Sequence, residues 1–212
     1  MSSRKIRVLY LNIKGQTRLT LAKQLMIQDM IKFYRCDIIH LQEADIDENC
    51  FSACDLIRND FFIIPNNSPS GYGTASLVRN EYAIENIRFD THGRVIMFNI
   101  DNVTFGNIYL EAGTDSASRS AREKYLSEVI PNMLTNKCQT GFCGGDWNCI
   151  VEKKDATHYP ESKISPNLTR LMNIFEWKDS YRCIFLNGND FSHYYSSGSI
   201  DGATRVHSLR IL

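Results

Sequence analysis

Five polar residues stand at the ends of short apolar runs, where a buried strand reaches the surface and can hold functional groups rigidly. They are Asn12, Glu43, Tyr109, Asp146 and Asn148. Each has an ordinary structural explanation when taken alone. Asparagine and Gly-Gly-Asp make turns, an acidic residue can belong to a solvated loop, and tyrosine is common in strands. Their joint occurrence, each at a strand end, favours a shared function.

The chemistry that fits these residues is phosphodiester hydrolysis. Mg²⁺ takes one or two carboxylates, several waters and a phosphate oxygen, which suits a lone Glu43 with amide neighbours. Asn12 and Asn148 could orient the metal shell or donate hydrogen bonds to a phosphate. A phenol at Tyr109 can donate to a non-bridging oxygen, and Asp146 can hold and deprotonate the attacking water.

The elements that must position these residues alternate between strands and helices. Residues 6–11 and 37–42 are apolar runs expected of strands buried on both faces. Between them, apolar residues at helical spacing indicate a helix; these are Ala22, Leu25, Met26, Met30 and Phe33. From residue 61 to 109, five β runs separated by turn residues suggest an antiparallel meander.

The second half of the chain continues the alternation. Residues 119–134 are typical of a helix, and residues 140–144 of a strand that runs into Gly-Gly-Asp-Trp-Asn. Ser165 as N-cap, with Pro166 at the first helical position, predicts a third helix. FSHYY and ATRVH are late strand candidates. The pattern favours one α/β domain over residues 1–212, a mixed sandwich with helices outside two sheets.

The composition excludes few classes of protein. The formal net charge is zero, so no global basic field indicates nucleic acid, although a local basic rim remains compatible with it. Seven cysteines without finger-like spacing favour reduced thiols over disulfides or zinc. No apolar run approaches the length needed to span a bilayer. We therefore expect a nuclear or cytoplasmic protein without a membrane partner.

Several motifs in order resemble the endonuclease/exonuclease/phosphatase superfamily, and within it the endonucleases of LINE-type (non-LTR) retrotransposons. The motifs are LYLNIKG, DIIHLQEAD, GYGTASLV, NIY, GGDWNCI and FSHYY…GATR, spread over residues 6–206. The resemblance implies a DNase I-like fold, a four-layer α/β sandwich of two mixed sheets flanked by helices. It also implies a Mg²⁺ or Mn²⁺ cofactor, duplex DNA as partner, and a reverse transcriptase fused in the parent element.

Site residues follow from the same resemblance, motif by motif. Asn12 and Glu43 match the family's metal-site residues, Tyr109 its transition-state tyrosine, and Asp146 and Asn148 its Asp-x-Asn pair. We expect all five to be catalytic. The resemblance implies DNA contacts by Ser192, Thr204 and Arg205, which flank a hairpin that these enzymes insert into a groove.

Three departures from the family pattern bear on activity. Leu110–Gly113 replaces the usual turn after NIY. The tail reads Val206-His207 where the family has Ile-Asp followed by a strand, and that Asp would orient the catalytic histidine. The family's terminal Ser-Asp-His motif would lie beyond Leu212, so we expect a C-terminally incomplete domain that lacks its last strand. His40, inside a buried strand, is expected to be a satisfied core residue.

Three hypotheses about function follow. The first is a Mg²⁺-dependent endonuclease that nicks one strand of target DNA and leaves a 3′-hydroxyl to prime reverse transcription. The second is a catalytically impaired relic of a retrotransposon that only folds or binds DNA weakly. The third keeps the fold but changes the substrate, as in a phospholipid or inositol-phosphate phosphodiesterase. Plasmid nicking and salt-dependent DNA binding separate them.

Overall fold

The computed structural model describes most of the chain, in two units that span residues 1–101 and 102–212. The described residues are 5–14, 19–47, 49–134, 140–155, 163–180, 183, 193–194, 203–204 and 209–211. For residues 193–194, 203–204 and 209–211 only the backbone is described. Within the described residues, no helix is long and hydrophobic enough to cross a membrane.

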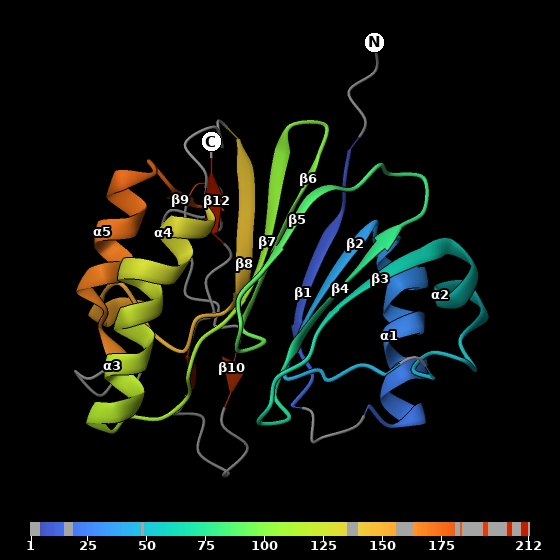
Figure 1. Ribbon diagram of the computed structural model, residues 1–212, viewed down its shortest axis with the longest axis horizontal. Helices are drawn as coiled ribbons and strands as arrows, with labels where there is room; N and C mark the ends of the chain where they lie inside the picture. The colour runs from blue at the N-terminus through green and yellow to red at the C-terminus, as the bar shows by residue number, and fades with distance from the viewer. Residues whose placement is uncertain are drawn as a thin grey trace. The chain divides into compact units, whose positions relative to one another are not determined.

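Unit 1 is built on a four-stranded mixed sheet of order β1-β2-β4-β3, in which β1 and β2 are parallel and the other pairs antiparallel. Figure 1 shows α1 and α2 on one side of this sheet. The elements of unit 1 are β1 (Val8–Asn12), α1 (Leu21–Tyr34), β2 (Ile38–Gln42), α2 (Asp55–Asp60), β3 (Phe61–Asn66), β4 (Thr74–Arg79), β5 (Glu85–Phe89) and β6 (Val95–Ile100).

The strands of unit 1 confirm most of the predicted runs, with two corrections. The second predicted strand, β2, is buried throughout, but β1 is only half-buried because it is the edge strand. The single meander is wrong. β4 already has β3 on one side and β2 on the other, so no edge remains for the next strand. β5 instead pairs antiparallel with β6.

The predicted first helix is confirmed as α1, but the apolar residues that indicated it are not the ones it buries. The buried side chains of α1 are Gln24, Ile27, Gln28 and Ile31. Both glutamines bond the backbone of the segment that follows β2: Gln24 Oε1 accepts from Phe51 N at 2.8 Å. Gln28 Oε1 accepts from Leu56 N at 3.1 Å. Inward polar residues therefore satisfy a loop backbone.

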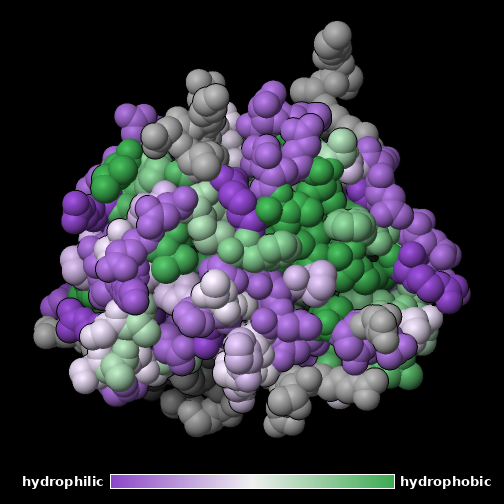
Figure 2. Space-filling view, viewed as in Figure 1, coloured by the Kyte–Doolittle hydropathy of each residue, from purple (hydrophilic) through white to green (hydrophobic). Residues whose placement is uncertain are grey.

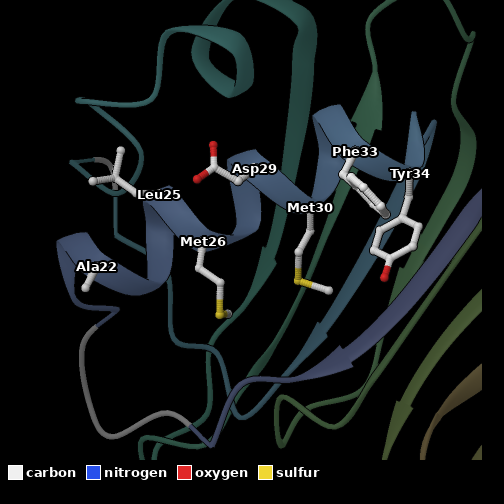
Figure 3. A pocket seen from close by; sticks show the side chains of 7 residues that line it. All are labelled: Ala22, Leu25, Met26, Asp29, Met30, Phe33 and Tyr34. Carbon is white, nitrogen blue, oxygen red and sulfur yellow. The ribbon is translucent and has the colours of Figure 1, made fainter.

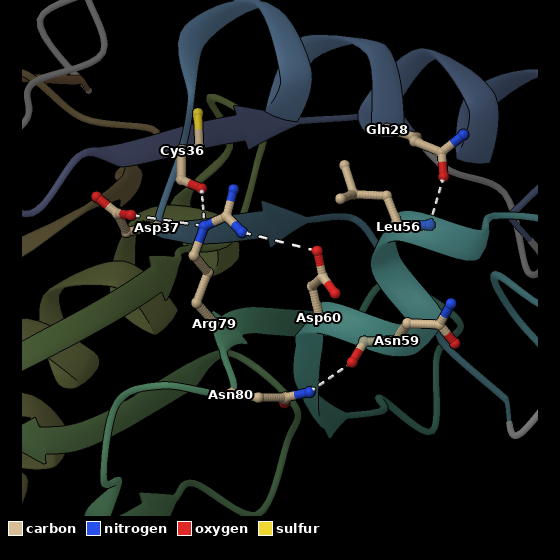
Figure 4. Close-up of polar contacts among 8 residues, drawn as sticks. All are labelled: Gln28, Cys36, Asp37, Leu56, Asn59, Asp60, Arg79 and Asn80. Carbon is tan, nitrogen blue, oxygen red and sulfur yellow. Dashed lines mark hydrogen bonds and ion pairs between the residues drawn. The ribbon is translucent and has the colours of Figure 1, made fainter.

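A polar cluster closes the end of the unit 1 sheet where β2 begins and β4 ends (Figure 4). Arg79 Nε donates to Cys36 O at 3.2 Å and lies 3.6 Å from Asp37 Oδ1. Its Nη1 is 3.9 Å from Asp60 Oδ2, and the guanidinium stacks on Phe61, 4.9 Å from the ring centroid. These contacts join β2, β4 and α2, so the charges at this end have a structural role.

Replacing Arg79 tests that structural role. We expect Arg79→Met to lower the free energy of unfolding by about 1–3 kcal/mol, because a half-buried carbonyl and two carboxylates lose a shared donor. The matched control is Arg58→Met, since the Arg58–Asp55 pair has side chains 57% and 80% exposed and should contribute about 0–1 kcal/mol. Urea unfolding measures both, and equal losses in the two variants would refute the assignment.

Unit 2 has a second mixed sheet, with strands in the order β7-β8-β12-β9. β7 and β8 are parallel, and β12 is antiparallel to both β8 and β9. Figure 1 shows α3, α4 and α5 together on one side of β8. The elements are β7 (Val103–Tyr109), α3 (Ser116–Lys124), a π-helical turn (Tyr125–Val129), α4 (Ile130–Met133), β8 (Gly141–Asp146), a 3₁₀ turn (Lys153–Asp155), α5 (Pro166–Ile174), β9 (Lys178–Asp179), β10 (His193–Tyr194), β11 (Ala203–Thr204) and β12 (Leu209–Ile211).

Two helix predictions in unit 2 are confirmed in detail. The predicted helix over residues 119–134 begins earlier, at Ser116, and contains the π-helical turn just before Pro131. A proline has no N–H to donate within a helix, and a wider turn accommodates it. α5 begins as predicted, because Ser165 Oγ accepts from Leu168 N at 3.0 Å.

The tail of unit 2 agrees in part with the sequence interpretation. β10 and β11 pair antiparallel, as expected of the two arms of a hairpin. Beyond them the backbone forms one more strand, β12. Pairing with β8 and β9 places β12 inside the sheet.

Candidate active site

In unit 1, Asn12 and Glu43 meet at the carboxyl ends of the parallel strands β1 and β2. Asn12 is in register with Gln42, so Glu43 is the first residue past the paired ends. Asn12 Nδ2 donates to Glu43 Oε1 at 3.0 Å, while Asn12 Oδ1 accepts from Lys14 N at 2.8 Å. The bond from Lys14 N thus fixes the side chain of Asn12, and Asn12 orients the carboxylate of Glu43. Glu43 Oε2 has no hydrogen-bond partner among the described residues.

The backbone at Glu43 is constrained on its C-terminal side. Glu43 has a φ of +54°, a left-handed conformation that non-glycine residues seldom adopt and that often marks functional sites. Ala44 N donates to Gly73 O at 2.9 Å, and Asp45 Oδ1 accepts from Gly73 N at 2.9 Å. A Cβ at Gly73 would collide with Asp45 Oδ1 and with Asn66 O, so glycine is required there. Asp45, two residues after Glu43, was not singled out from the sequence.

The chemistry of this pair suits a hard divalent cation. Carboxylate and amide oxygens are the ligands that Mg²⁺ and Mn²⁺ prefer, and one carboxylate with open coordination positions is typical of a magnesium site that also binds phosphate. Glu43 supplies an oriented carboxylate with one oxygen available. Among the described residues, no three His, Cys, Asp or Glu side chains form a closed metal cluster.

In unit 2, Tyr109 and Asp146 are neighbours at the carboxyl ends of the parallel strands β7 and β8, where their Cα positions are in register. Neighbours in register lie on the same face of a sheet. Gly145, just before Asp146, has a φ of +133°, and a Cβ there would collide with Ile108 O. Only glycine lets β8 approach β7 at this point. The glycine before Asp146 therefore places the carboxylate beside Tyr109.

The turn that follows Asp146 is held from both sides. Asn148, with a φ of +47°, donates its backbone N–H to Asp146 Oδ1 at 3.1 Å. Its Nδ2 donates to Leu110 O at 2.9 Å. Trp147 between them is 1% exposed and packs edge-on against Trp177. A buried tryptophan thus anchors the turn, and its two polar neighbours lie on either side of that anchor.

The structure therefore groups the predicted catalytic residues as one pair and one trio. Asn12 and Glu43 are joined by a hydrogen bond in unit 1, and Tyr109, Asp146 and Asn148 surround the ends of β7 and β8 in unit 2. Of the predicted DNA contacts, Ser192 and Arg205 lie outside the described residues, and Thr204 is described only as backbone in β11.

Two cations near the trio were missed by the sequence interpretation. Arg122 is 1% exposed, and its Nη1 donates to the carbonyls of Glu111 and Gly113. Lys163 Nζ donates to Asn148 O at 3.0 Å. A signal for the first was present in the sequence, since Arg122 stands at four-residue spacing with Leu126 and Ile130 on a buried helical stripe. Lys163 had no comparable signal.

His40 belongs to the core, as expected, but it is not fully satisfied. Its Nδ1 lies 2.8 Å from Ser76 Oγ, and the ring stacks on Tyr10. Phe98 lies against it with a centroid separation of 5.8 Å. Nε2 is buried without a hydrogen-bond partner among the described residues. Burial lowers the pKa of His40 to about 3, so this ring stays neutral near pH 7 and takes no part in acid–base chemistry there.

The lowered pKa of His40 predicts how stability depends on pH. An unfolded histidine titrates near pH 6.5, so between about pH 6.5 and 3 the unfolded chain binds a proton that the folded chain does not. This group alone should lower the free energy of unfolding by about 1.4 kcal/mol for each unit that the pH falls within that window. Urea unfolding from pH 7 to 4 measures it. The double variant His40→Leu/Ser76→Ala should lose this dependence of the free energy of unfolding on pH. The control His92→Asn, which replaces an exposed histidine, should keep it. Identical slopes in both variants and in the original protein would contradict the assignment.

An exposed apolar groove lies along α1 (Figure 3). It measures about 630 Å³ and is lined by Ala22, Leu25, Met26, Asp29, Met30, Phe33 and Tyr34. Figure 2 shows hydrophobic surface gathered on the side of the view where Figure 1 draws α1. One carboxylate among thioethers and aromatic rings offers neither a nucleophile nor a proton relay. The groove is therefore not a candidate catalytic site.

No protein-family model matches this chain, and no curated protein matches its sequence. Solved structures do match. A 3′-5′ exonuclease from Neisseria meningitidis is 19% identical with a TM-score of 0.76, covering 97% of this chain and 86% of that one. A Neisseria 3′ phosphatase bound to a product DNA hairpin is 18% identical with a TM-score of 0.74, covering 97% and 85%. An AP endonuclease from Archaeoglobus fulgidus is 18% identical with a TM-score of 0.70, covering 96% and 84%.

At these identities the likeness establishes the fold. The chain has an α/β fold with two mixed sheets flanked by helices, as in these DNA-processing enzymes, so the predicted DNase I-like fold class is confirmed. Many activities share one fold, and function has to be argued from the site.

Proposed function

We propose that this protein is a Mg²⁺-dependent endonuclease that hydrolyses a phosphodiester bond of DNA. The observation that carries the proposal is the same in both units. A carboxylate stands at the carboxyl end of a parallel strand pair and accepts a hydrogen bond from an asparagine: Glu43 from the side-chain amide of Asn12, and Asp146 from the backbone N–H of Asn148. A structural neighbour, the 3′ phosphatase bound to a product DNA hairpin, supports the substrate class.

In this proposal Asp146, whose Oδ1 accepts from Asn148 N, accepts the proton of the attacking water. Tyr109 donates a hydrogen bond from its phenolic O–H to a non-bridging phosphate oxygen, where negative charge grows in the transition state. Asn148 has one amide N–H on Leu110 O and a second that can donate to the same phosphate.

Glu43 and Asn12 would hold the divalent cation, Glu43 through its available carboxylate oxygen. When bound, Mg²⁺ neutralises charge on the phosphate and stabilises the leaving oxygen. Asn12 fixes the rotamer of Glu43 through its 3.0 Å bond to Oε1.

The motifs that resemble LINE-type endonucleases further suggest the biological task. We propose target-site nicking for retrotransposition, in which the free 3′-hydroxyl primes a reverse transcriptase encoded by the same element. Such a protein would act in the nucleus, or be made in the cytoplasm and enter it. The backbone hairpin of β10 and β11 would contact DNA, with Ser192, Thr204 and Arg205 as the contacts.

The experiment is incubation with supercoiled plasmid, with and without Mg²⁺. We expect conversion to nicked circle that requires Mg²⁺ or Mn²⁺ and is lost in Glu43→Ala. Two further substrates, a duplex with an abasic site and a duplex with a 3′ phosphate, distinguish nicking from the activities of the structural neighbours. Plasmid that stays supercoiled with the original protein, as with Glu43→Ala, would overturn the nickase proposal.

The two units should act as one catalytic domain over residues 1–212. If Glu43 and Asp146 serve the same chemical step, the double variant Glu43→Gln/Asp146→Asn should be little slower than the slower single variant, because residues of one catalytic unit are strongly non-additive. Rate losses that multiply would show that the two residues act independently.

A further inference from the structure

The loop that follows Tyr109 depends on side chains from elsewhere in unit 2 for its backbone hydrogen bonds. Arg122 Nη1, on α3, donates to Glu111 O at 2.9 Å and to Gly113 O at 2.7 Å. One guanidinium nitrogen carries two N–H groups, so it can serve both carbonyls. Because α3 begins only a few residues after this loop, Arg122 ties the loop back onto the helix that it leads into.

A guanidinium in this position is costly. Arg122 is 1% exposed, and burial lowers its pKa from the usual value. Removing a cation from water is unfavourable, and an apolar residue on the same helical stripe as Leu126 and Ile130 would avoid that cost. An apolar residue, however, has no hydrogen-bond donors for Glu111 O and Gly113 O. The loop contacts therefore give a reason for a buried arginine.

A second chain of bonds links this loop to the turn after Asp146. Leu110 N donates to Asp146 O at 2.9 Å, and Asn148 Nδ2 donates back to Leu110 O at 2.9 Å. Lys163 Nζ then donates to Asn148 O at 3.0 Å. The loop after β7 and the turn after β8 are thus joined to each other, and a cation bonds each of them from outside.

Lys163 is itself held by backbone contacts. Ile150 N donates to Lys163 O at 2.8 Å, and Ser165 N donates to Ile150 O at 3.0 Å. These bonds form a short parallel bridge between Ile150 and Ile164. Because Ser165 also caps α5, the position of Lys163 is set by the start of that helix.

We propose that Arg122 and Lys163 are positioning residues of the candidate nuclease, which hold Tyr109, Asp146 and Asn148 in their reactive arrangement by bonding the backbone carbonyls of Glu111, Gly113 and Asn148. The catalytic part of this proposal rests on the proposed function. The positioning network itself rests only on the hydrogen bonds described above. Neither cation touches substrate in this scheme. Both act through the loop and the turn.

The first test is hydrogen exchange, which needs no activity. In Arg122→Met the amide of Leu110, and in Lys163→Met the amide of Asn148, should exchange at least about tenfold faster, while amides inside the β7–β8 pairing keep their protection. Arg119→Met on the same helix and Arg170→Met on α5 replace exposed cations and serve as matched controls. Unchanged protection of Leu110 and Asn148 in both folded variants would overturn the proposal.

The second test is steady-state kinetics of nicking. Misplacing a catalytic group by about 1 Å can cost about 100-fold, so kcat should fall by roughly 10- to 100-fold in Arg122→Met and Lys163→Met with KM nearly unchanged. Lys163→Arg keeps a donor near Asn148 O and should recover most of the loss. Leu126→Ala, on the same buried stripe, lowers stability without removing a donor and should leave kcat within about twofold when folded.

The outcomes separate the two proposals. If the Leu110 and Asn148 amides exchange faster in the two variants but the original protein does not nick DNA, the proposed function is refuted and the positioning network is retained. Nicking with an unchanged kcat in Arg122→Met and Lys163→Met, or an equal loss in Leu126→Ala, would reduce both cations to ordinary stabilising residues. If Arg122→Met does not fold, Arg122→Lys and Lys163→Met carry the same test, since lysine keeps the charge but not the fork of donors.

Discussion

Asp146→Asn should leave a folded protein that nicks DNA about 10²- to 10⁴-fold more slowly at saturating substrate. An amide cannot take the proton of the attacking water, and a positioned general base contributes a factor of this size. The fold should survive, because the amide oxygen of the new asparagine can still accept from Asn148 N, as Asp146 Oδ1 does at 3.1 Å. Single-turnover nicking at saturating Mg²⁺ measures the chemical step without product release.

The control for Asp146→Asn is Glu128→Gln, which removes one exposed carboxylate from unit 2. Its rate should match that of the original protein. A rate for Asp146→Asn within about threefold of the original would remove Asp146 from the chemistry. In that case the bond from Asn148 would make Asp146 a turn residue, the ordinary explanation that Gly-Gly-Asp also allows.

Glu43→Gln should abolish most metal-dependent activity, with a loss of about 100-fold or more at a fixed low Mg²⁺ concentration. A neutral amide oxygen binds a hard dication more weakly than a carboxylate does, so part of the rate should return as Mg²⁺ is raised. Asn12 Nδ2 can donate to the new amide oxygen as it does to Glu43 Oε1, which preserves the local geometry. Titration calorimetry with Mg²⁺ alone gives an independent readout.

Asn12→Ala tests whether Asn12 supports the metal site. If Asn12 acts through Glu43, metal affinity should fall by about 10- to 100-fold, the usual cost of losing a residue that orients a ligand. Glu85→Gln, at an exposed position of β5, is the matched control for Glu43→Gln. Equal Mg²⁺ affinity in Glu43→Gln and Glu85→Gln would show that Glu43 binds no metal.

Local sequence patterns predicted the elements and the ends at which the candidate residues lie. The strand runs, the N-cap at Ser165 and the glycines before Asp146 are recognisable because each depends on neighbours within a few residues. A parallel pair brings equivalent strand ends together, so once β1 pairs with β2 and β7 with β8, the polar residues at their carboxyl ends become neighbours. The sequence could therefore name Asn12, Glu43, Tyr109 and Asp146 as residues at strand ends, whereas the pairing of those strands comes from the structure.

Which face of a helix is buried could not be predicted in the same way. The stripe of Leu25, Met26 and Phe33 has the spacing of a core face, yet Phe33 is 80% exposed. α1 buries Gln24 and Gln28 instead, because the unpaired backbone at Phe51 and Leu56 needs acceptors that apolar side chains lack. The choice of face thus depended on a loop more than twenty positions away in the chain.

Local patterns are enough to predict the alternation of strands and helices, the glycines before Asp146 and the polar residues at strand ends. The order of β4 between β2 and β3, the hydrogen bond from Asn12 to Glu43, and the contacts of Arg122 and Lys163 with the loops around Asp146 follow only from the folded chain. The difference arises from the distance along the chain over which each interaction acts. Propensities, caps and turns act between neighbours in the chain, whereas strand order and the satisfaction of a buried carbonyl depend on whichever distant segment the fold brings within about 3 Å.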